Sequence, residues 1–157
     1  MKKWMLIILT IVIIIIIWQL VAIYQTAMSP IRENEKEVSQ IAQQQKGLHT
    51  ITNFYNYNGT SSYTIIVGLN EDNEEHILWF NDKKEIVLSK PAKEGIAKED
   101  VLNFLDTDRT PKKIISVSLA MEDEEPLWEI KFKDENDRYN LYYIEFENGV
   151  YYQRITF

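Results

Sequence analysis

The chain has 157 residues and no cysteine, and its formal net charge is −7 at pH 7. The lack of cysteine excludes disulfides, thiol chemistry and cysteine-based metal sites. Residues 1–28 hold two lysines and no acidic residue, so the rest of the chain carries 15 basic and 24 acidic side chains. This acidic balance argues against binding to nucleic acid and against flat adhesion to an anionic membrane, since both need a basic surface.

An apolar run from Trp4 to Tyr24 opens the chain, directly after Lys2 and Lys3. In a helix that rises 1.5 Å per residue, such a run spans about 30 Å, the thickness of the hydrocarbon core of a bilayer. The run therefore predicts a single transmembrane helix within an N-terminal segment of residues 1–28. The predicted anchor residues are Lys2, Lys3, Trp4, Trp18 and Tyr24, with Trp4 and Tyr24 placed as interfacial aromatics.

A cleaved signal peptide is the main alternative to a retained anchor. Cleavable apolar regions are shorter, roughly 7–15 residues, and end in small residues, whereas bulky Ile23 and Tyr24 end this run. A buried core helix is a third interpretation, but a domain of this size cannot surround a helix that is apolar on all sides. Basic residues flank the apolar run on both sides, with Lys2 and Lys3 before it and Arg32 and Lys36 after it, so their numbers are nearly balanced. Because the two lysines directly adjoin the run, we expect a single-pass protein of the cell membrane with its N-terminus inside and its C-terminal domain extracytoplasmic.

The first predicted unit covers residues 29–90. Ser29 and Pro30 are typical of a helix start, and the helix should run to Lys46 with Gly47 as its C-cap. Four strand patterns follow at 49–57, 63–67, 76–80 and 85–89, the first two joined by a predicted Asn58-Gly59 hairpin turn.

The second predicted unit covers residues 91–157 and repeats this order. A short helix is expected at about 98–105, with Thr110-Pro111 marking its end. Strands follow at about 114–121, 127–133, 139–146 and 150–157. A shift of 65 residues places Ile65 on Ile130, so the strands of the two halves match. The predicted fold class is α+β: a transmembrane helix, then two tandem units, each a helix plus an antiparallel sheet.

This architecture, together with the segments Leu127-Trp128-Glu129-Ile130-Lys131-Phe132 and Glu145-Phe146-Glu147-Asn148-Gly149-Val150, resembles the YpmB/TseB-like family of Gram-positive bacteria. That resemblance implies two PepSY or cystatin-like units behind the anchor. It also implies a non-catalytic, extracytoplasmic regulator of cell-wall elongation that binds a class B penicillin-binding protein. The first unit departs from the family pattern at its last turn, where Lys83 stands in place of a common glycine. The cystatin likeness alone would suggest a peptidase inhibitor or chaperone-like module, which is the alternative function.

No residue pattern predicts catalysis, a cofactor or a metal. His49 and His76 lie far apart and lack H-E-x-x-H spacing. The acidic turns at 72–75 and 134–137 lack the spacing of a calcium loop, and no serine-nucleophile motif is present. We therefore expect a protein that is not an enzyme, with no catalytic, cofactor-binding or metal-binding residues and no nucleic-acid partner. A hydrolase is the weakest alternative.

Four tyrosines flank the last predicted hairpin: Tyr142, Tyr143, Tyr151 and Tyr152. Neighbouring residues of a strand point to opposite faces, so each pair should place one ring in the core and one on the surface. Because exposed tyrosines are favourable at protein interfaces, these four are the candidate partner-binding residues. The alternative is a two-sided core, formed by the paired units, that takes up both sets of rings.

Overall fold

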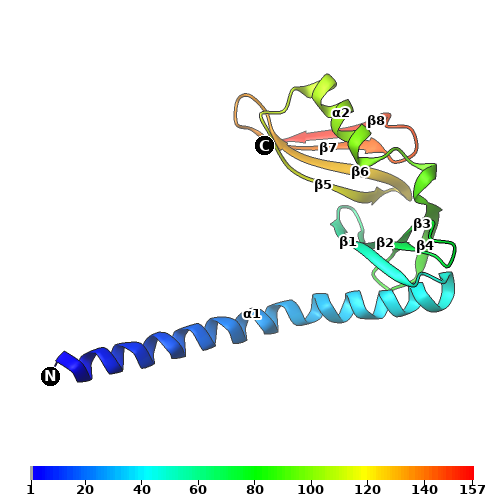
Figure 1. Ribbon diagram of the computed structural model, residues 1–157. Coiled ribbons are helices and arrows are strands. Elements are labelled where there is room, and N and C mark those ends of the chain that lie inside the picture. The colour runs from blue at the N-terminus through cyan, green and yellow to red at the C-terminus, as the bar shows by residue number, and fades with distance from the viewer. Residues whose placement is uncertain (1) are drawn as a thin grey trace. The chain divides into compact units, whose positions relative to one another are not determined.

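A computed structural model describes residues 2–157, apart from the side chain of Lys2 (Figure 1). The chain divides into two compact parts, one that ends at Glu37 and one from Val38 to Phe157. The elements of the first unit are α1 (Lys2–Lys46), β1 (Thr50–Asn58), β2 (Ser62–Leu69), β3 (Glu75–Phe80) and β4 (Ile86–Pro91). A 3-10 turn, η1 (Ala92–Glu94), leads to α2 (Lys98–Arg109), β5 (Lys113–Glu122), β6 (Glu125–Lys133), β7 (Tyr139–Glu145) and β8 (Tyr151–Thr156).

The N-terminal stretch of α1 exposes its apolar side chains. Trp4, Trp18 and Tyr24 are 73%, 70% and 57% exposed, and the aliphatic residues between them are exposed as well. By length and composition α1 can cross a membrane. None of its most apolar stretch of 18 residues is buried in protein. A helix that is apolar all round needs an apolar environment, which lipid supplies. Lys3 is exposed too, whereas the side chain of Lys2 lies outside what the structure describes.

α1 runs without a break through Ser29 and Pro30, so the predicted helix start at these residues is wrong. Ser29 is not a cap, because it lies inside the helix, where its hydroxyl donates to the Glu33 carboxylate (3.4 Å). Pro30 lies inside α1, several helical turns after its start. As an interior proline it removes one backbone hydrogen bond of the helix. The predicted end is confirmed: Gly47 adopts φ 65° and its N–H donates to the Gln43 carbonyl oxygen (3.1 Å).

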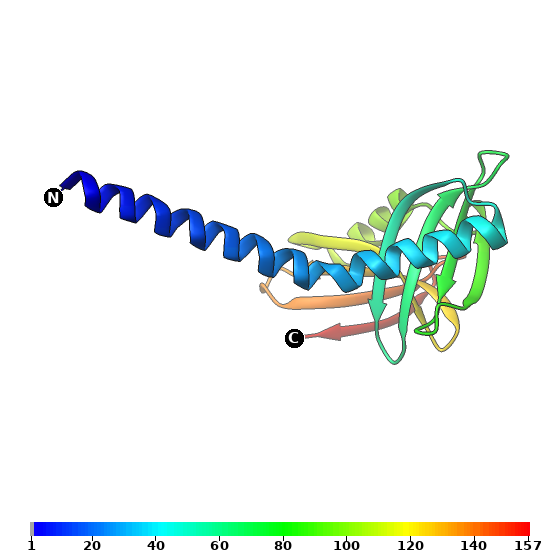
Figure 2. The same ribbon diagram turned by 90° about the horizontal axis from the view of Figure 1, so that it is seen from below.

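Each unit is a helix followed by an antiparallel meander, in the orders β1-β2-β3-β4 and β5-β6-β7-β8. The α+β prediction is therefore confirmed. Val38 and Ala42, near the end of α1, pack on the first sheet in a cluster with Ile66, Leu78 and Phe80. α2 lies across the second sheet in both views (Figures 1 and 2), and it buries Val101 and Leu105.

A single hydrophobic cluster joins the two sheets. Residues of both sheets and of α2 belong to it. Trp79 of β3 is fully buried, and its indole N–H donates to the Ala120 carbonyl oxygen of β5 (3.1 Å). The Trp79 ring also meets Phe146 edge to face, with a centroid distance of 5.8 Å. Because the partners of Trp79 come from the other unit, the two sheets share one core.

α2 continues four residues beyond the expected range of about 98–105 and ends where Thr110-Pro111 predicted. The segment Asp106-Thr107-Asp108 has the composition of a turn, yet it forms the last turn of the helix. The Thr107 hydroxyl donates to the Asn103 carbonyl oxygen (2.9 Å), one turn earlier in the same helix. The helix ends at Thr110, whose left-handed φ of 41° precedes Pro111.

The first hairpin turns where Asn58-Gly59 predicted, but with three loop residues, because Asn58 pairs with Ser62. Glu122 of the second unit binds this hairpin. Its carboxylate accepts hydrogen bonds from the Tyr57 hydroxyl (2.6 Å) and the Thr60 N–H (3.0 Å). A Cβ atom at Gly59 would meet the Glu122 carboxylate and the Tyr57 hydroxyl, so a larger residue here would displace those side chains.

The internal repeat is real but its register is 64 residues, one less than predicted. Asn73 and Asp137 occupy equivalent turn positions with φ 59° and 60°. In the strand pairing that leads to these turns, Ile66 and not Ile65 corresponds to Ile130. Side chains alternate between the faces of a strand, so a slip of one residue exchanges the two faces. The predicted alignment therefore matched residues of opposite faces.

Candidate partner-binding surface

Tyr142 and Tyr143 are both buried, 4% and 6% exposed, so the prediction of one surface ring in this pair is wrong. The two side chains do point to opposite faces of β7. The Tyr142 hydroxyl donates to Asp108 of α2 (2.8 Å), whereas the Tyr143 ring meets Tyr57 of β1 (6.4 Å between centroids). Both rings are buried because α2 covers one face of the second sheet and the first unit covers part of the other.

Tyr143 belongs to a buried polar network. Its hydroxyl donates to the Glu129 carboxylate (2.8 Å), which is 6% exposed and also pairs with Lys131 Nζ (3.0 Å). Burial, followed by the hydrogen bond to Glu129, raises the pKa of Tyr143. A buried carboxylate needs such partners. The geometry assigns Tyr143 a structural role.

Tyr142 supports an aromatic stack that reaches the surface. Its ring lies 5.6 Å from the Tyr151 ring, and the Arg109 guanidinium lies 5.5 Å from the Tyr142 centroid and 5.8 Å from that of Tyr151. Burial, followed by the hydrogen bond to Asp108, raises the pKa of Tyr142 to about 12. Cation–π contacts of this kind hold Tyr151 in place while it remains 51% exposed.

Two other exposed apolar side chains lie at or against the β7–β8 loop, which leads into Tyr151. Phe104 of α2 is 46% exposed and Val150 is 53% exposed. A Cβ atom at Gly149 would lie 3.0 Å from Ile96 and from Phe104, so the β7–β8 loop touches both residues. We call Ile96, Phe104, Val150 and Tyr151 the α2 patch. A recess of about 490 Å³ lies beside it, lined by Ile96, Asp100, Asn103, Phe104 and Thr107.

Tyr152 points away from the α2 patch. It is partly buried, and its hydroxyl donates to Asp123 in the β5–β6 turn (3.3 Å). Ile155, on the same strand, is 37% exposed, and Phe157 is 71% exposed. The second sheet thus offers a second exposed apolar area, at Ile155 and Phe157. The assignment of these four tyrosines to partner binding stays a prediction.

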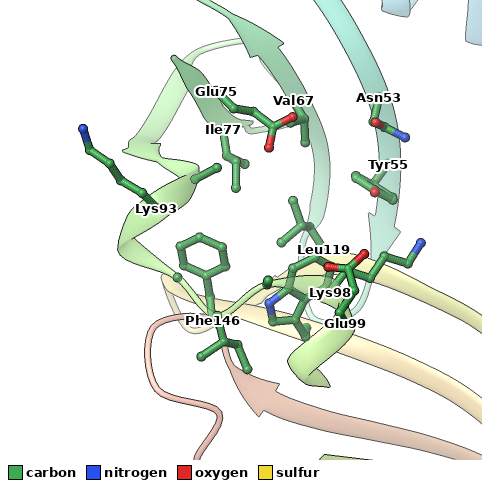
Figure 3. A pocket seen from close by; sticks show the side chains of 15 residues that line it. Asn53, Tyr55, Val67, Glu75, Ile77, Lys93, Lys98, Glu99, Leu119 and Phe146 are labelled. Carbon is green, nitrogen blue, oxygen red and sulfur yellow. The ribbon is translucent and has the colours of Figure 1, made fainter. Parts of the chain in front are cut away.

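A pocket of about 450 Å³ lies between the two units, shown in Figure 3. Its apolar lining includes Val67, Ile77, Leu119 and Phe146. Polar groups at the pocket come from β1, β3, η1 and the start of α2. They are Asn53, Tyr55, Glu75, Lys93, Lys98 and Glu99. In Figure 3 the Lys93 ammonium points away from the centre, and it pairs with Glu74 (2.7 Å).

Within residues 2–157, no group of three or more histidine, aspartate or glutamate residues is arranged to hold a metal. His49 is engaged elsewhere, with Nδ1 2.7 Å from the Leu69 carbonyl oxygen. The acidic turn at 134–137 is closed by its own residues: Asp134 accepts from the Asn136 and Arg138 N–H groups (3.0 Å each). Hydrogen bonds and ion pairs thus account for these groups.

Sequence reasoning missed Phe104 and Val150 as surface residues and missed the pocket altogether. Phe104 lies between helical positions that are buried, so periodicity gave only a weak signal that it faces outward. Val150 follows Gly149, which the sequence assigned to a turn. The pocket has no local signal, because its lining residues are brought together from both units.

Three comparisons with known proteins all find similarity to TseB or YpmB proteins. Residues 39–81 match the family described as "Cell wall elongation regulator TseB-like domain". The probable cell wall elongation regulator TseB of Bacillus subtilis (strain 168) is 28% identical over 136 residues, which are 86% of this chain and 84% of that protein. The solved structure of YpmB protein from Bacillus subtilis superposes with a TM-score of 0.70 at 27% identity, covering 77% of this chain and 95% of that chain.

Proposed function

Because the chain belongs to the YpmB/TseB family of cell wall elongation regulators, we propose that it is a membrane-anchored, extracytoplasmic regulator that binds a class B penicillin-binding protein. It does so without catalysis of its own. The observation that carries this proposal is the α2 patch, a group of exposed and partly exposed apolar side chains beside α2 and one of two exposed apolar areas of the second unit. Exposed aromatic residues that are held rigidly are favoured at the centres of protein interfaces.

The apolar stretch of α1 supports the membrane part of the proposal. We propose a retained anchor with the N-terminus inside, so that residues 38–157 share a membrane surface with an anchored synthase. Two proteins tethered in one membrane meet at a high effective concentration, so a weak contact between them suffices. The acidic charge of the domain then contributes to the choice of partner more than to affinity.

The contact at the α2 patch is tested by photo-crosslinking in cells with the full chain. A photoreactive phenylalanine analogue replaces Tyr151, and adducts are probed with fluorescent penicillin. We expect an adduct that contains a penicillin-binding protein. The additional change Phe104→Ser should reduce its yield, while Ile155→Ser, on the other face of β8, should leave the yield unchanged as the matched control.

Three results would contradict the proposal. If the adduct persists at full yield with Phe104→Ser and disappears with Ile155→Ser, the contact lies at Ile155 and Phe157 instead. If the adduct contains only a peptidase, the inhibitor function replaces the regulator function. If no adduct forms although the protein reaches the membrane, the α2 patch is not a contact surface.

A further inference from the structure

One face of the second sheet is only partly covered. α2 lies over the other face, which holds Phe132 and Tyr142, because the Tyr142 hydroxyl donates to α2 and its ring meets that of Phe132. Lys131 and Lys133 adjoin Phe132 in β6, so they point to the opposite face. The first unit covers this second face at Tyr143, but it leaves both lysines partly exposed.

The strand pairing extends this partly covered face beyond β6. Residues directly opposite each other on two strands point to the same face, so β5, β7 and β8 contribute to it. Its aromatic end is formed by Tyr139 and Phe157, whose rings lie 6.2 Å apart at the end of the sheet where β8 ends (Figure 1). We call the set the open face: Lys113, Lys131, Lys133, Tyr139, Ile155 and Phe157. All of its members are exposed or partly exposed.

The charge around the open face is opposite in sign to that of the whole chain. The strands and the β6–β7 hairpin bring more basic than acidic side chains to this end: Lys112, Lys113, Lys131, Lys133, Arg138 and Arg154 against Glu129, Asp134, Glu135 and Asp137. Glu129, Asp134 and Asp137 each already pair with a basic neighbour. Neither Lys113 nor Lys133 forms an ion pair within residues 2–157. The open face is therefore locally basic in a chain whose net charge is −7.

The two lysines without an ion pair repel each other. Lys113 and Lys133 lie directly opposite in β5 and β6, and like charges in such a pair are destabilising. An anionic ligand on the open face would offset this repulsion. The ligand must also cover apolar surface, because Phe157 is 71% exposed and Ile155 is 37% exposed. The open face thus suits an occupant that is both anionic and apolar.

We infer that the open face docks on a membrane surface that contains anionic lipid, with its lysines at the phosphate groups and with Tyr139 and Phe157 inserted between the lipids. Binding of this kind increases with buried apolar area and with attraction to anionic lipid. The net charge of the chain argues against such docking, but the fold gathers basic side chains of separate strands on one face. Because the Debye length at physiological salt is about 8 Å, acidic groups elsewhere on the domain are largely screened.

The anchor favours a bilayer over an acidic protein as the occupant. The chain that carries the open face also carries an apolar helix able to cross a membrane, so lipid is present at a high effective concentration and a weak attraction suffices. The inference rests on this anchor and not on the identity of the synthase. The crosslinking control Ile155→Ser keeps the three lysines and both aromatic residues of the open face.

The test places a fluorescent label on the full chain in lipid nanodiscs, with one chain in each disc. The chain has no cysteine, so a single substitution accepts one label. Gln153→Cys puts the label at an exposed position of β8, on the same side as Ile155. Asn103→Cys, at an exposed position of α2, is the control on the opposite side of the sheet. Lipids with a nitroxide at the headgroup quench a label that approaches the surface, and gel filtration first confirms that the chain has entered the discs.

We expect stronger quenching of the Gln153 label than of the Asn103 label in discs that contain phosphatidylglycerol, and a loss of this difference in pure phosphatidylcholine or at raised salt. Lys113→Gln and Lys133→Gln together should lower the ratio of docked to undocked domain about twentyfold, since each lysine near an anionic surface contributes about a factor of five. Lys83→Gln and Lys98→Gln remove the same charge at exposed positions outside the open face, and they should leave the ratio unchanged.

Four outcomes overturn the inference. Equal quenching of the Gln153 label with and without phosphatidylglycerol means that anionic lipid is not the ligand. Equal quenching of the two labels means that no face of the domain prefers the membrane. If both pairs of lysine substitutions have the same effect, the lysines of the open face do not hold the domain on lipid. Weak quenching of the Gln153 label in every lipid, although the chain is in the discs, leaves an acidic protein surface as the occupant.

Discussion

Glu122 is the residue that links the first hairpin to the second sheet. Its carboxylate accepts from Tyr57 and Thr60, and a hydrogen bond to a charged group contributes about 1.5–3 kcal/mol. Burial alone would raise the pKa of Glu122, but the hydrogen bonds from Tyr57 and Thr60 outweigh it and lower the pKa below the ordinary value of 4.5. The folded state therefore favours the ionised carboxylate.

The lowered pKa of Glu122 predicts a loss of stability in acid. A carboxylate with a lower pKa in the folded state contributes stability that is fully present above its unfolded pKa of 4.5 and is lost as pH falls through the folded pKa. In Glu122→Gln, the free energy of unfolding should fall less steeply below pH 4.5 than in the wild type. Urea titrations over this range would measure it. Glu124→Gln, at an exposed neighbour, is the control, and an equal slope in both variants would contradict the role of Glu122.

At the scale of elements, α2 has two sides with different tasks. Leu105 is fully buried in the shared core, while the adjacent Phe104 is 46% exposed in the α2 patch. Helical geometry separates these two side chains although they are neighbours in sequence. α2 therefore both stabilises the second sheet and presents apolar surface.

Two alanine substitutions should separate these tasks. Leu105→Ala should lower the free energy of unfolding by about 2–5 kcal/mol, because it leaves a cavity in the core. Phe104→Ala should lower it by about 1 kcal/mol or less, since the ring already contacts solvent. Denaturant unfolding of the full chain would measure both. Similar losses for the two variants would show that Phe104 is a core residue and would remove it from the α2 patch.

At the scale of the whole molecule, the two sheets depend on each other. Trp79 of the first sheet finds its hydrogen-bond acceptor and its aromatic partner in the second unit. Units of about 60 residues bury little of their surface alone and are marginally stable. Residues 38–157 form one compact part with a core that both sheets share.

We therefore expect both sheets to unfold in a single transition. Trp79→Phe removes one hydrogen bond and some buried area, and it should lower the melting temperature of the whole domain, because the lost contacts join the two units. Calorimetry of the full chain in detergent would test this. Two separate transitions, only one of them shifted by the substitution, would show that the units fold independently.

The anchor makes a prediction about topology. The apolar stretch of α1 is exposed and long enough to cross a bilayer. Protease added to intact protoplasts should degrade residues 38–157 and leave a short fragment in the membrane. The same treatment after lysis is the control for protease access. Full protection in intact protoplasts would reverse the proposed orientation, and a soluble form in the medium would show that the segment is cleaved.

The sequence by itself determined the order of elements, because hydrophobic length and alternation act locally. The apolar run, the meander strands and the Gly47 cap all follow from such patterns. Tertiary structure decided the rest. The Tyr142 and Tyr143 rings are both buried because two layers cover β7, and the first hairpin is bound by Glu122, which comes from the other unit. Likewise the repeat register depends on which face of each strand the helix covers. The pocket at Trp128 exists only where two distant units meet, so no local pattern could predict it.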